Sequence, residues 1–105
     1  MNAKDFVTSL PERVAPEAIE GMETVFHFDI SGEEGVQATV TLKDGKADYQ
    51  DGLHGEPRCL VTSTDENLKK LLKGELNPMM AVMTGKVKIS NVSEMMKYAK
   101  IFGLM

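Results

Sequence analysis

The 105 residues suffice for one domain that buries about two-thirds of its unfolded surface, and we expect residues 1–105 to form that single domain. The chain has 42% hydrophobic and 27% charged residues, as is typical of a globular protein. Its net charge is −4 and its lysines are scattered along the sequence. This argues against nucleic acid as a partner, because phosphate binding needs a concentrated basic surface.

Cysteine content and apolar runs bear on the location of the protein. The single cysteine, Cys59, cannot form an internal disulfide, so we expect the reducing cytoplasm. The first residues lack the apolar core of a signal peptide. The longest uninterrupted apolar run, Met79–Met83, is far too short to cross a bilayer.

The first half of the chain predicts helical turns followed by three strands. Residues 3–20 form a broken helical segment. Its inward side chains are Phe6, Leu10, Val14 and Ile19. Strict alternation over 24–30 and over 36–42 predicts two half-buried strands. Asp44-Gly45 is a strong tight-hairpin signal, and a third strand over 47–50 completes an antiparallel meander with one solvent-exposed face.

The second half predicts two more strands between helices. A strand over 58–62 leads into a helix that Ser63 and Glu66 open as a capping box. The apolar face of this helix carries Leu68, Leu71 and Leu72. A short strand over 86–90 alternates, and its lysines suit the edge of a sheet. A final helix over 92–102 follows, and Asn91 with Glu94 three residues on suggests a capping box at its start. Its apolar face carries Val92, Met95, Met96, Ala99 and Phe102.

Between these elements lies a short helix with almost no polar residue. Asn77 caps it, Pro78 suits its first position, and Gly85 can adopt the left-handed conformation that ends it. Because Met79–Met83 is apolar nearly all round, the helix must be buried against the core, a partner or a bound apolar ligand. Six of the eight methionines fall in the last 27 positions. Methionine adapts to varied apolar shapes, which fits a soft core and a ligand cavity alike.

The sequence contains few candidates for catalytic or metal-ligating residues. Cys59 lies within an apolar strand, and His54 precedes it in a loop, which predicts a buried, inert thiol. His27 and Asp29 share a strand face, but two ligands make a poor metal site, and a solvated sheet face is the simpler interpretation. We therefore expect no active site, no metal and no cofactor.

Several stretches, in order along nearly the whole chain, carry a family resemblance. They are residues 10–18, 25–32, 40–45, 59–65, and 71–78 running into 83–89. The most specific part is Gly74-Glu75-Leu76-Asn77-Pro78 followed by Gly85-Lys86-Val87-Lys88-Ile89. On these motifs the chain resembles the sterol carrier protein family of lipid-binding domains, in its stand-alone bacterial-type form.

The resemblance implies an α/β (α+β) fold. A five-stranded, mostly antiparallel sheet would be covered on one face by helices, with a hydrophobic tunnel between them for fatty acids, fatty acyl-CoA, sterols or other lipids. By position, the resemblance assigns the ligand-binding wall to Phe26, Phe28, Leu68, Leu72, Leu76, Met79, Met80, Val82, Met83, Met96, Phe102 and Leu104. The last helix would then act as a lid over the tunnel.

Three functions fit these observations. The first is a non-catalytic lipid carrier, a monomer or homodimer that touches membranes transiently. The second is an accessory module of lipid or isoprenoid-quinone metabolism that docks another subunit through the same apolar surface. The third is an enzyme or a detached enzyme subunit, which the lack of an acid–base constellation disfavours. We expect the first.

Overall fold

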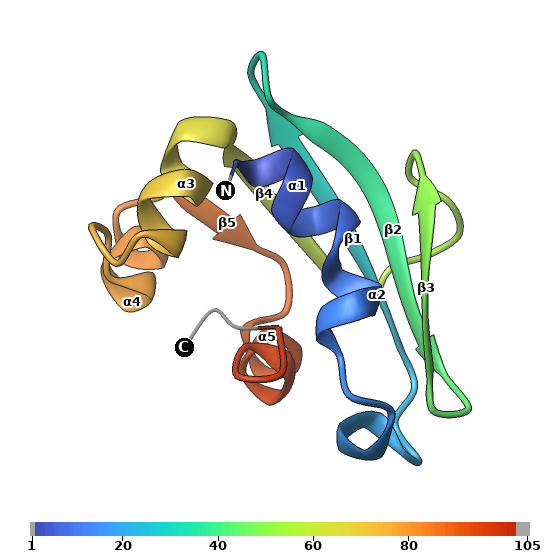
Figure 1. The fold of residues 1–105 in the computed structure, drawn as a ribbon. Coiled ribbons are helices and arrows are strands. Elements are labelled where there is room, and N and C mark those ends of the chain that lie inside the picture. Colours follow the sequence, from blue (N-terminus) through green and yellow to red (C-terminus); the bar gives the residue numbers. More distant parts are fainter. Residues whose placement is uncertain (1, 103–105) are drawn as a thin grey trace.

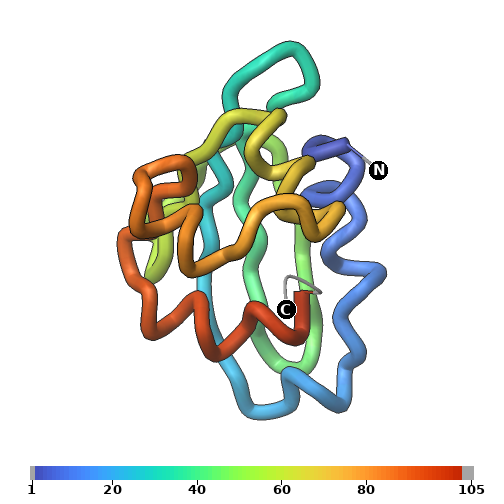
Figure 2. Tube along the Cα trace, turned by 90° about the vertical axis from the view of Figure 1, so that its left-hand side faces the viewer, coloured from blue at the N-terminus to red at the C-terminus, as the bar shows by residue number. Residues whose placement is uncertain are grey.

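The computed structural model describes residues 2–102, and a five-stranded sheet lies at its centre (Figure 1). The strands are β1 (Thr24–Ser31), β2 (Val36–Lys43), β3 (Lys46–Asp51), β4 (Cys59–Thr64) and β5 (Val87–Ile89). The helices are α1 (Ala3–Thr8), α2 (Leu10–Arg13), the 3-10 turn η1 (Pro16–Ile19), α3 (Asp65–Leu72), α4 (Pro78–Met83) and α5 (Val92–Tyr98). Figure 2 shows α3, α4 and α5 in front of the strands, with the N-terminal helices along their right-hand side, so that one face of the sheet is covered.

The strand order is β3-β2-β1-β4-β5. The pairs β1–β2, β2–β3 and β4–β5 are antiparallel, whereas β1 and β4 run parallel. In this register Phe26 lies opposite Val40 on one side and Cys59 on the other. The predicted meander and the predicted mostly antiparallel sheet are confirmed, and the lysine-bearing strand β5 does lie at an edge.

The other face of the sheet is partly covered by the loop over 52–58. The Nε2 atom of His27 lies 2.8 Å from the carbonyl oxygen of His54. The hydroxyl of Thr39 donates to the carbonyl of Gly52 and accepts from the amide of His54. His27 is therefore only 6% exposed. The expectation that His27 lies on a solvated face was wrong, because a loop distant in sequence folds over it.

The helix ends follow local capping chemistry, with one shift from the predicted positions. Asn77 accepts hydrogen bonds from the first amides of α4, and Asn91 accepts one from Glu94, as predicted. The helix α3, however, is capped by the hydroxyl of Thr64, which accepts from the amide of Asn67 at 3.1 Å. Ser63 is instead a buried residue of β4, so the proposed Ser63 capping box was wrong.

The N-terminal helices and residues 92–102 both contribute to the core. The predicted broken segment over 3–20 is confirmed, and its four inward side chains are buried. The helix α5 ends at Tyr98, earlier than predicted, and residues 99–102 continue as a turn. None of the helices within residues 2–102 is both long and apolar enough to cross a membrane.

Candidate functional site

A cavity of about 120 Å³ lies between the sheet and the helices α3, α4 and α5. Within residues 2–102, every residue that lines it is apolar. They are Phe6, Phe28, Val61, Leu68, Leu71, Pro78, Met79, Val82, Met83, Val87, Ile89, Val92, Met95, Met96 and Ala99. Such a wall offers no hydrogen-bonding side chain to a ligand, so it can hold only an apolar molecule or the apolar part of one.

A shallow outer groove of about 490 Å³ adjoins this cavity. The two spaces share the side chains of Leu71, Pro78, Met79 and Met96, which form the wall between them. Small-molecule pockets usually measure about 300–1,000 Å³, so the cavity is too small for a drug-sized ligand. A long apolar ligand therefore requires this wall to move, which would join the cavity to the groove.

The methionines of α4 are largely exposed to solvent. Met79, Met80 and Met83 are 61%, 53% and 76% exposed, and Ala81 is the buried residue of this helix. Burial in the core, the first of the three alternatives for this helix, is therefore wrong. A partner and a bound apolar ligand remain. The same side chains Met79 and Met83 also line the cavity, so the apolar surface continues from the outside into the interior.

The predicted ligand-binding residues differ in where the structure places them. Phe28, Leu68, Met79, Val82, Met83 and Met96 line the cavity, and Leu76 lines the outer groove. Phe26 and Phe102 are fully buried in the core, whereas Leu72 and Met80 line neither space. Leu104 lies outside the described residues. The role of each of these side chains in ligand binding stays a prediction.

Four aromatic rings form a cluster beside the cavity. They belong to Phe26, Phe28, Tyr98 and Phe102. The ring centroid of Phe26 lies 5.2 Å from that of Phe102 and 5.5 Å from that of Tyr98, both edge-to-face. This geometry is favourable for aromatic pairs. We call these rings the aromatic cluster; through Phe28 it also borders the cavity.

Several wall residues were not among the predicted site. Val61, Val87 and Ile89 come from β4 and β5, and Phe6 comes from α1. Val61 pairs with Ile89 in the sheet. Alternation within these strands carries a signal for the inward positions, but the signal does not say which inward residue borders a cavity and which packs tightly.

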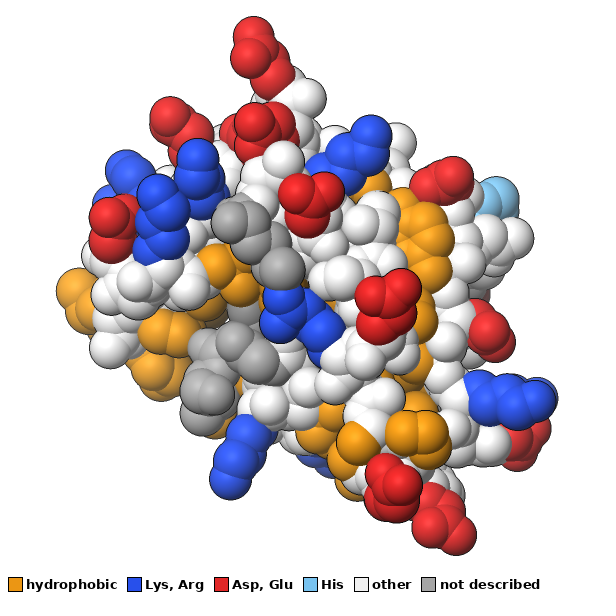
Figure 3. Space-filling model, viewed as in Figure 1, with side chains coloured by type: hydrophobic (Ala, Val, Ile, Leu, Met, Phe, Trp, Pro, Cys, Tyr) orange, Lys and Arg blue, Asp and Glu red, His pale blue; other side chains and the backbone are white. Residues whose placement is uncertain are grey.

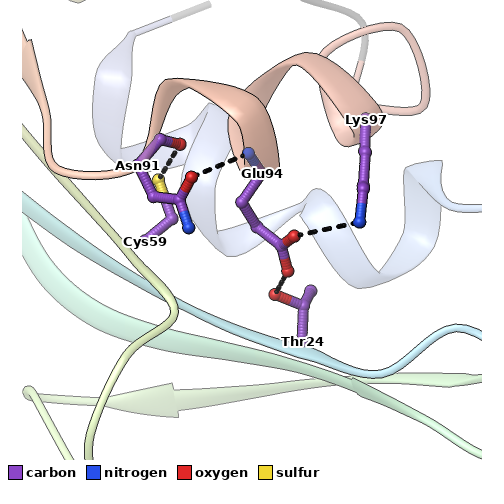
Figure 4. A network of polar contacts seen from close by, with 5 residues as sticks. All are labelled: Thr24, Cys59, Asn91, Glu94 and Lys97. Atoms are coloured by element: carbon purple, nitrogen blue, oxygen red, sulfur yellow. Dashed lines mark hydrogen bonds and ion pairs between the residues drawn. The ribbon is translucent and has the colours of Figure 1, made fainter.

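A polar network ties α5 to the sheet (Figure 4). The carboxylate of Glu94, 6% exposed, accepts a hydrogen bond from the hydroxyl of Thr24 at 2.5 Å and lies 3.6 Å from the ammonium of Lys97. The thiol of Cys59 donates weakly to the carbonyl of Asn91. Because Thr24 belongs to β1 and Cys59 to β4, the first turn of α5 is fixed at two points.

The buried surroundings of Glu94 also raise the pKa values of two neighbouring side chains. Burial raises the pKa of the Cys59 thiol, and the charge of Glu94 raises it further. Burial, again with a contribution from Glu94, also raises the pKa of the Tyr98 phenol. Since the thiolate is the reactive form, the prediction of a buried and inert cysteine agrees with this geometry.

Within residues 2–102, no three His, Cys, Asp or Glu side chains come together in a way that could hold a metal ion.

A mixed sheet with one layer of helices and an apolar cavity between them defines a class of small α+β domains built to enclose a hydrophobic molecule. The chain belongs to the SCP-2 sterol transfer family, whose model matches residues 4–103. The family resemblance and the expected five-stranded α+β fold are thereby confirmed, whereas the hydrophobic tunnel stays a prediction. Membership in this family implies lipid binding or transfer.

The curated relatives are much longer proteins. Hydroxysteroid dehydrogenase-like protein 2 from Rattus norvegicus is 31% identical over 97 residues, which cover 86% of this chain and 18% of the relative. Its counterpart from Xenopus tropicalis is 33% identical over 94 residues, covering 88% and 22%. This chain thus spans about one fifth of the length of these relatives, and it matches only that part of them.

Solved structures share the fold. Palmitated SCP2L2 from Aedes aegypti has a TM-score of 0.72 at 24% identity and covers 97% of this chain and 95% of its own. The ubiquinone synthesis protein UbiJ-SCP2 has a TM-score of 0.61 at 14% identity, covering 96% and 82%. The sec-alkylsulfatase Pisa1 from Pseudomonas sp. has a TM-score of 0.75 at 19% identity, covering 100% of this chain and 16% of the sulfatase. At these identities the likeness is one of fold.

Proposed function

We propose that this chain is a non-catalytic lipid carrier that takes up fatty acids, fatty acyl-CoA, sterol-like molecules or other apolar ligands between its sheet and the helices α3, α4 and α5. The observation that carries the proposal is the cavity wall, to which the described part of the chain contributes apolar side chains alone. Burying an alkyl chain there gains about 0.8 kcal/mol per methylene. The palmitated state of the Aedes aegypti protein of the same fold supports an acyl chain as one such ligand.

The flexible side chains around the cavity support a broad choice of ligands. Met79, Met83, Met95 and Met96 all contribute to the wall. Methionine has no branch and three rotatable bonds, so it can follow ligands of different shape. The polar head of any ligand has to stay in the outer groove or in water, because the wall has no partner for it.

Native mass spectrometry of the purified chain, followed by identification of the extracted lipids, tests this proposal. We expect bound lipid, and we expect a fluorescent acyl probe to be displaced by unlabelled fatty acid. A chain that carries no lipid and binds no acyl probe would contradict the carrier function.

A second candidate function is an accessory module of lipid or isoprenoid-quinone metabolism. Two observations favour it: the exposed methionines of α4, and the shared fold with a ubiquinone synthesis protein. In this case the apolar surface docks another subunit. A lipid-free chain that forms a complex only through α4 would favour the module over the carrier.

We further propose that the carrier works in the cytoplasm, where a single buried free thiol such as Cys59 is stable. Expression of a tagged chain followed by cell fractionation tests this location, and recovery in a secreted or organelle fraction would contradict it.

A further inference from the structure

One surface of the molecule combines exposed apolar side chains with the entrance to the cavity. We define the methionine face as Met79, Met80 and Met83 of α4 together with Val92 and Met96 of α5, all exposed. Four of these five, all except Met80, also line the cavity. A contiguous exposed apolar patch of this kind marks a contact surface, and here the contact surface is also the boundary of the ligand site.

Charge is unevenly divided along the chain, although the lysines look scattered in the sequence. Residues 65–105 contain seven lysines and four acidic residues, a net charge of +3. Residues 1–64 contain five basic and twelve acidic residues, a net charge of −7. The helices α3, α4 and α5 and the strand β5 all belong to the basic part. The methionine face is therefore carried by the cationic part of an anionic protein.

These lysines are available to an external partner. All seven are exposed. Among the residues that the structure describes, Lys97 pairs with Glu94, and the other six make no ion pair. Figure 3 shows basic side chains over α3 next to the hydrophobic side chains over α4, whereas acidic side chains gather around the β1–β2 hairpin.

We propose that the methionine face docks on an anionic lipid surface, an inference that rests on the proposed carrier function. Exposed apolar side chains flanked by lysines are the combination that binds such a surface, because the apolar groups enter the interface while the lysines contact the lipid phosphates. A second copy of this chain fits less well, since a two-fold interface would bring the two cationic parts together.

The N-terminal helices do not offer the same combination. Residues 3–20 contain Lys4 and Arg13 against four acidic residues, and their large apolar side chains are turned into the core. The orientation of the protein on the bilayer is thereby set: the cavity faces the lipid, and the acidic sheet end faces away. A ligand could then move between bilayer and cavity without crossing bulk water.

Vesicle sedimentation with a matched pair of variants tests the docking. The wild-type chain should bind vesicles of equimolar phosphatidylcholine and phosphatidylglycerol. It should bind pure phosphatidylcholine vesicles at least about tenfold more weakly. It should be released from the anionic vesicles in 1 M salt, where the Debye length is about 3 Å. Lys70→Glu with Lys73→Glu should weaken binding at least about tenfold. Lys43→Glu with Lys46→Glu, the same charge change at the β2–β3 hairpin, should weaken it less than about twofold.

A fluorescent acyl probe, added without vesicles, separates this inference from the carrier function. Both lysine variants should bind the probe like the wild type. A wild-type chain that binds the probe but not the anionic vesicles would overturn the docking alone; one that binds neither would overturn both. Equal losses of vesicle binding in the two lysine variants would also overturn the docking. So would a wild-type chain that does not bind vesicles but forms a dimer, if Met80→Glu dissociates that dimer.

Discussion

The space between sheet and helices is filled in two ways. At one end, the rings of Phe26, Tyr98 and Phe102 pack edge-to-face or stacked, with Phe26 and Phe102 fully buried. At the other end, methionines from α4 and α5 surround a cavity, and all of them except Met95 remain exposed. Rigid rings with few rotamers suit a fixed core, whereas methionine suits a wall that changes shape. One end of the domain therefore maintains the fold, and the other is free to accommodate a ligand.

The largest effect should come from the aromatic end. Phe102→Ala removes a fully buried ring, and we expect the free energy of unfolding to fall by about 3–5 kcal/mol. Met83→Ala at the methionine end should change it by less than about 0.5 kcal/mol, because that side chain is mostly exposed. Urea denaturation measures both. Similar losses in the two variants would remove the distinction between the two ends.

This expectation also bears on the lid. Because Phe102 is part of the core, deletion of residues 100–105 should destabilise the whole domain rather than merely open the cavity. The helix α4, with only Ala81 buried, is the more mobile candidate for the wall that moves.

The next effect concerns the polar network that fixes α5 between the two ends. Thr24→Val keeps the side-chain shape but removes the donor to the buried Glu94 carboxylate, and we expect a loss of about 1–3 kcal/mol in the free energy of unfolding. Thr41→Val is the control, because the Thr41 hydroxyl makes no hydrogen bond within residues 2–102. If both variants unfold at the same urea concentration, Glu94 does not fix α5.

At the methionine end, two neighbouring methionines should respond differently to the same change. Met83→Glu places a carboxylate at the cavity wall. Because a bound alkyl chain would remove water from this carboxylate, the substitution should weaken acyl-probe binding about tenfold. Met80→Glu changes a side chain outside the cavity lining and should leave the affinity within about twofold. Fluorescence titration measures both affinities. Equal losses would restore Met80 to the ligand-binding wall that the family resemblance assigned it to.

The smallest effect is a dependence of stability on pH at the aromatic end, where Cys59 pairs with Phe26 in the sheet. The folded-state pKa of Cys59 lies above its ordinary value of 9.0, so the native state holds its proton longer than the unfolded state does. Stability is therefore fully present below pH 9 and falls as the pH rises above it. Thermal unfolding of the wild type between pH 8 and pH 9.5 should show a slightly steeper decline than that of Cys59→Ala; identical slopes would contradict the assignment.

Most of the fold could be predicted because its signals are local. Alternation marked β1 and β2, Asp44-Gly45 marked the hairpin, and Asn77 and Asn91 marked helix starts. The parallel pairing of β1 with β4 depends on contacts between segments that are far apart in the sequence, and no local pattern encodes it. The burial of His27 beneath the loop over 52–58 was missed for the same reason.

The candidate site was predicted less completely than the fold. Its helical wall followed from the apolar faces of α3, α4 and α5 and from the family resemblance. Tyr98 was overlooked as a core residue, because a tyrosine at a helix end is compatible with either a surface or an interior position. Which apolar residues border a cavity and which pack tightly depends on how well neighbouring side chains fill space, and that is a property of the assembled core.

The weak anchoring of α4 has a consequence for ligand affinity. If the cavity must enlarge before it binds, only the fraction of molecules with α4 displaced is competent, and the apparent dissociation constant equals the intrinsic one divided by that fraction. An open population of about 1% would weaken the apparent affinity about a hundredfold. Amide hydrogen exchange measures this population directly. The amides of α4 should exchange through local opening, whereas the amides of β1 should exchange only through global unfolding. Substitutions that hold α4 more firmly against the sheet should therefore stabilise the protein and lower its apparent affinity for lipid at the same time.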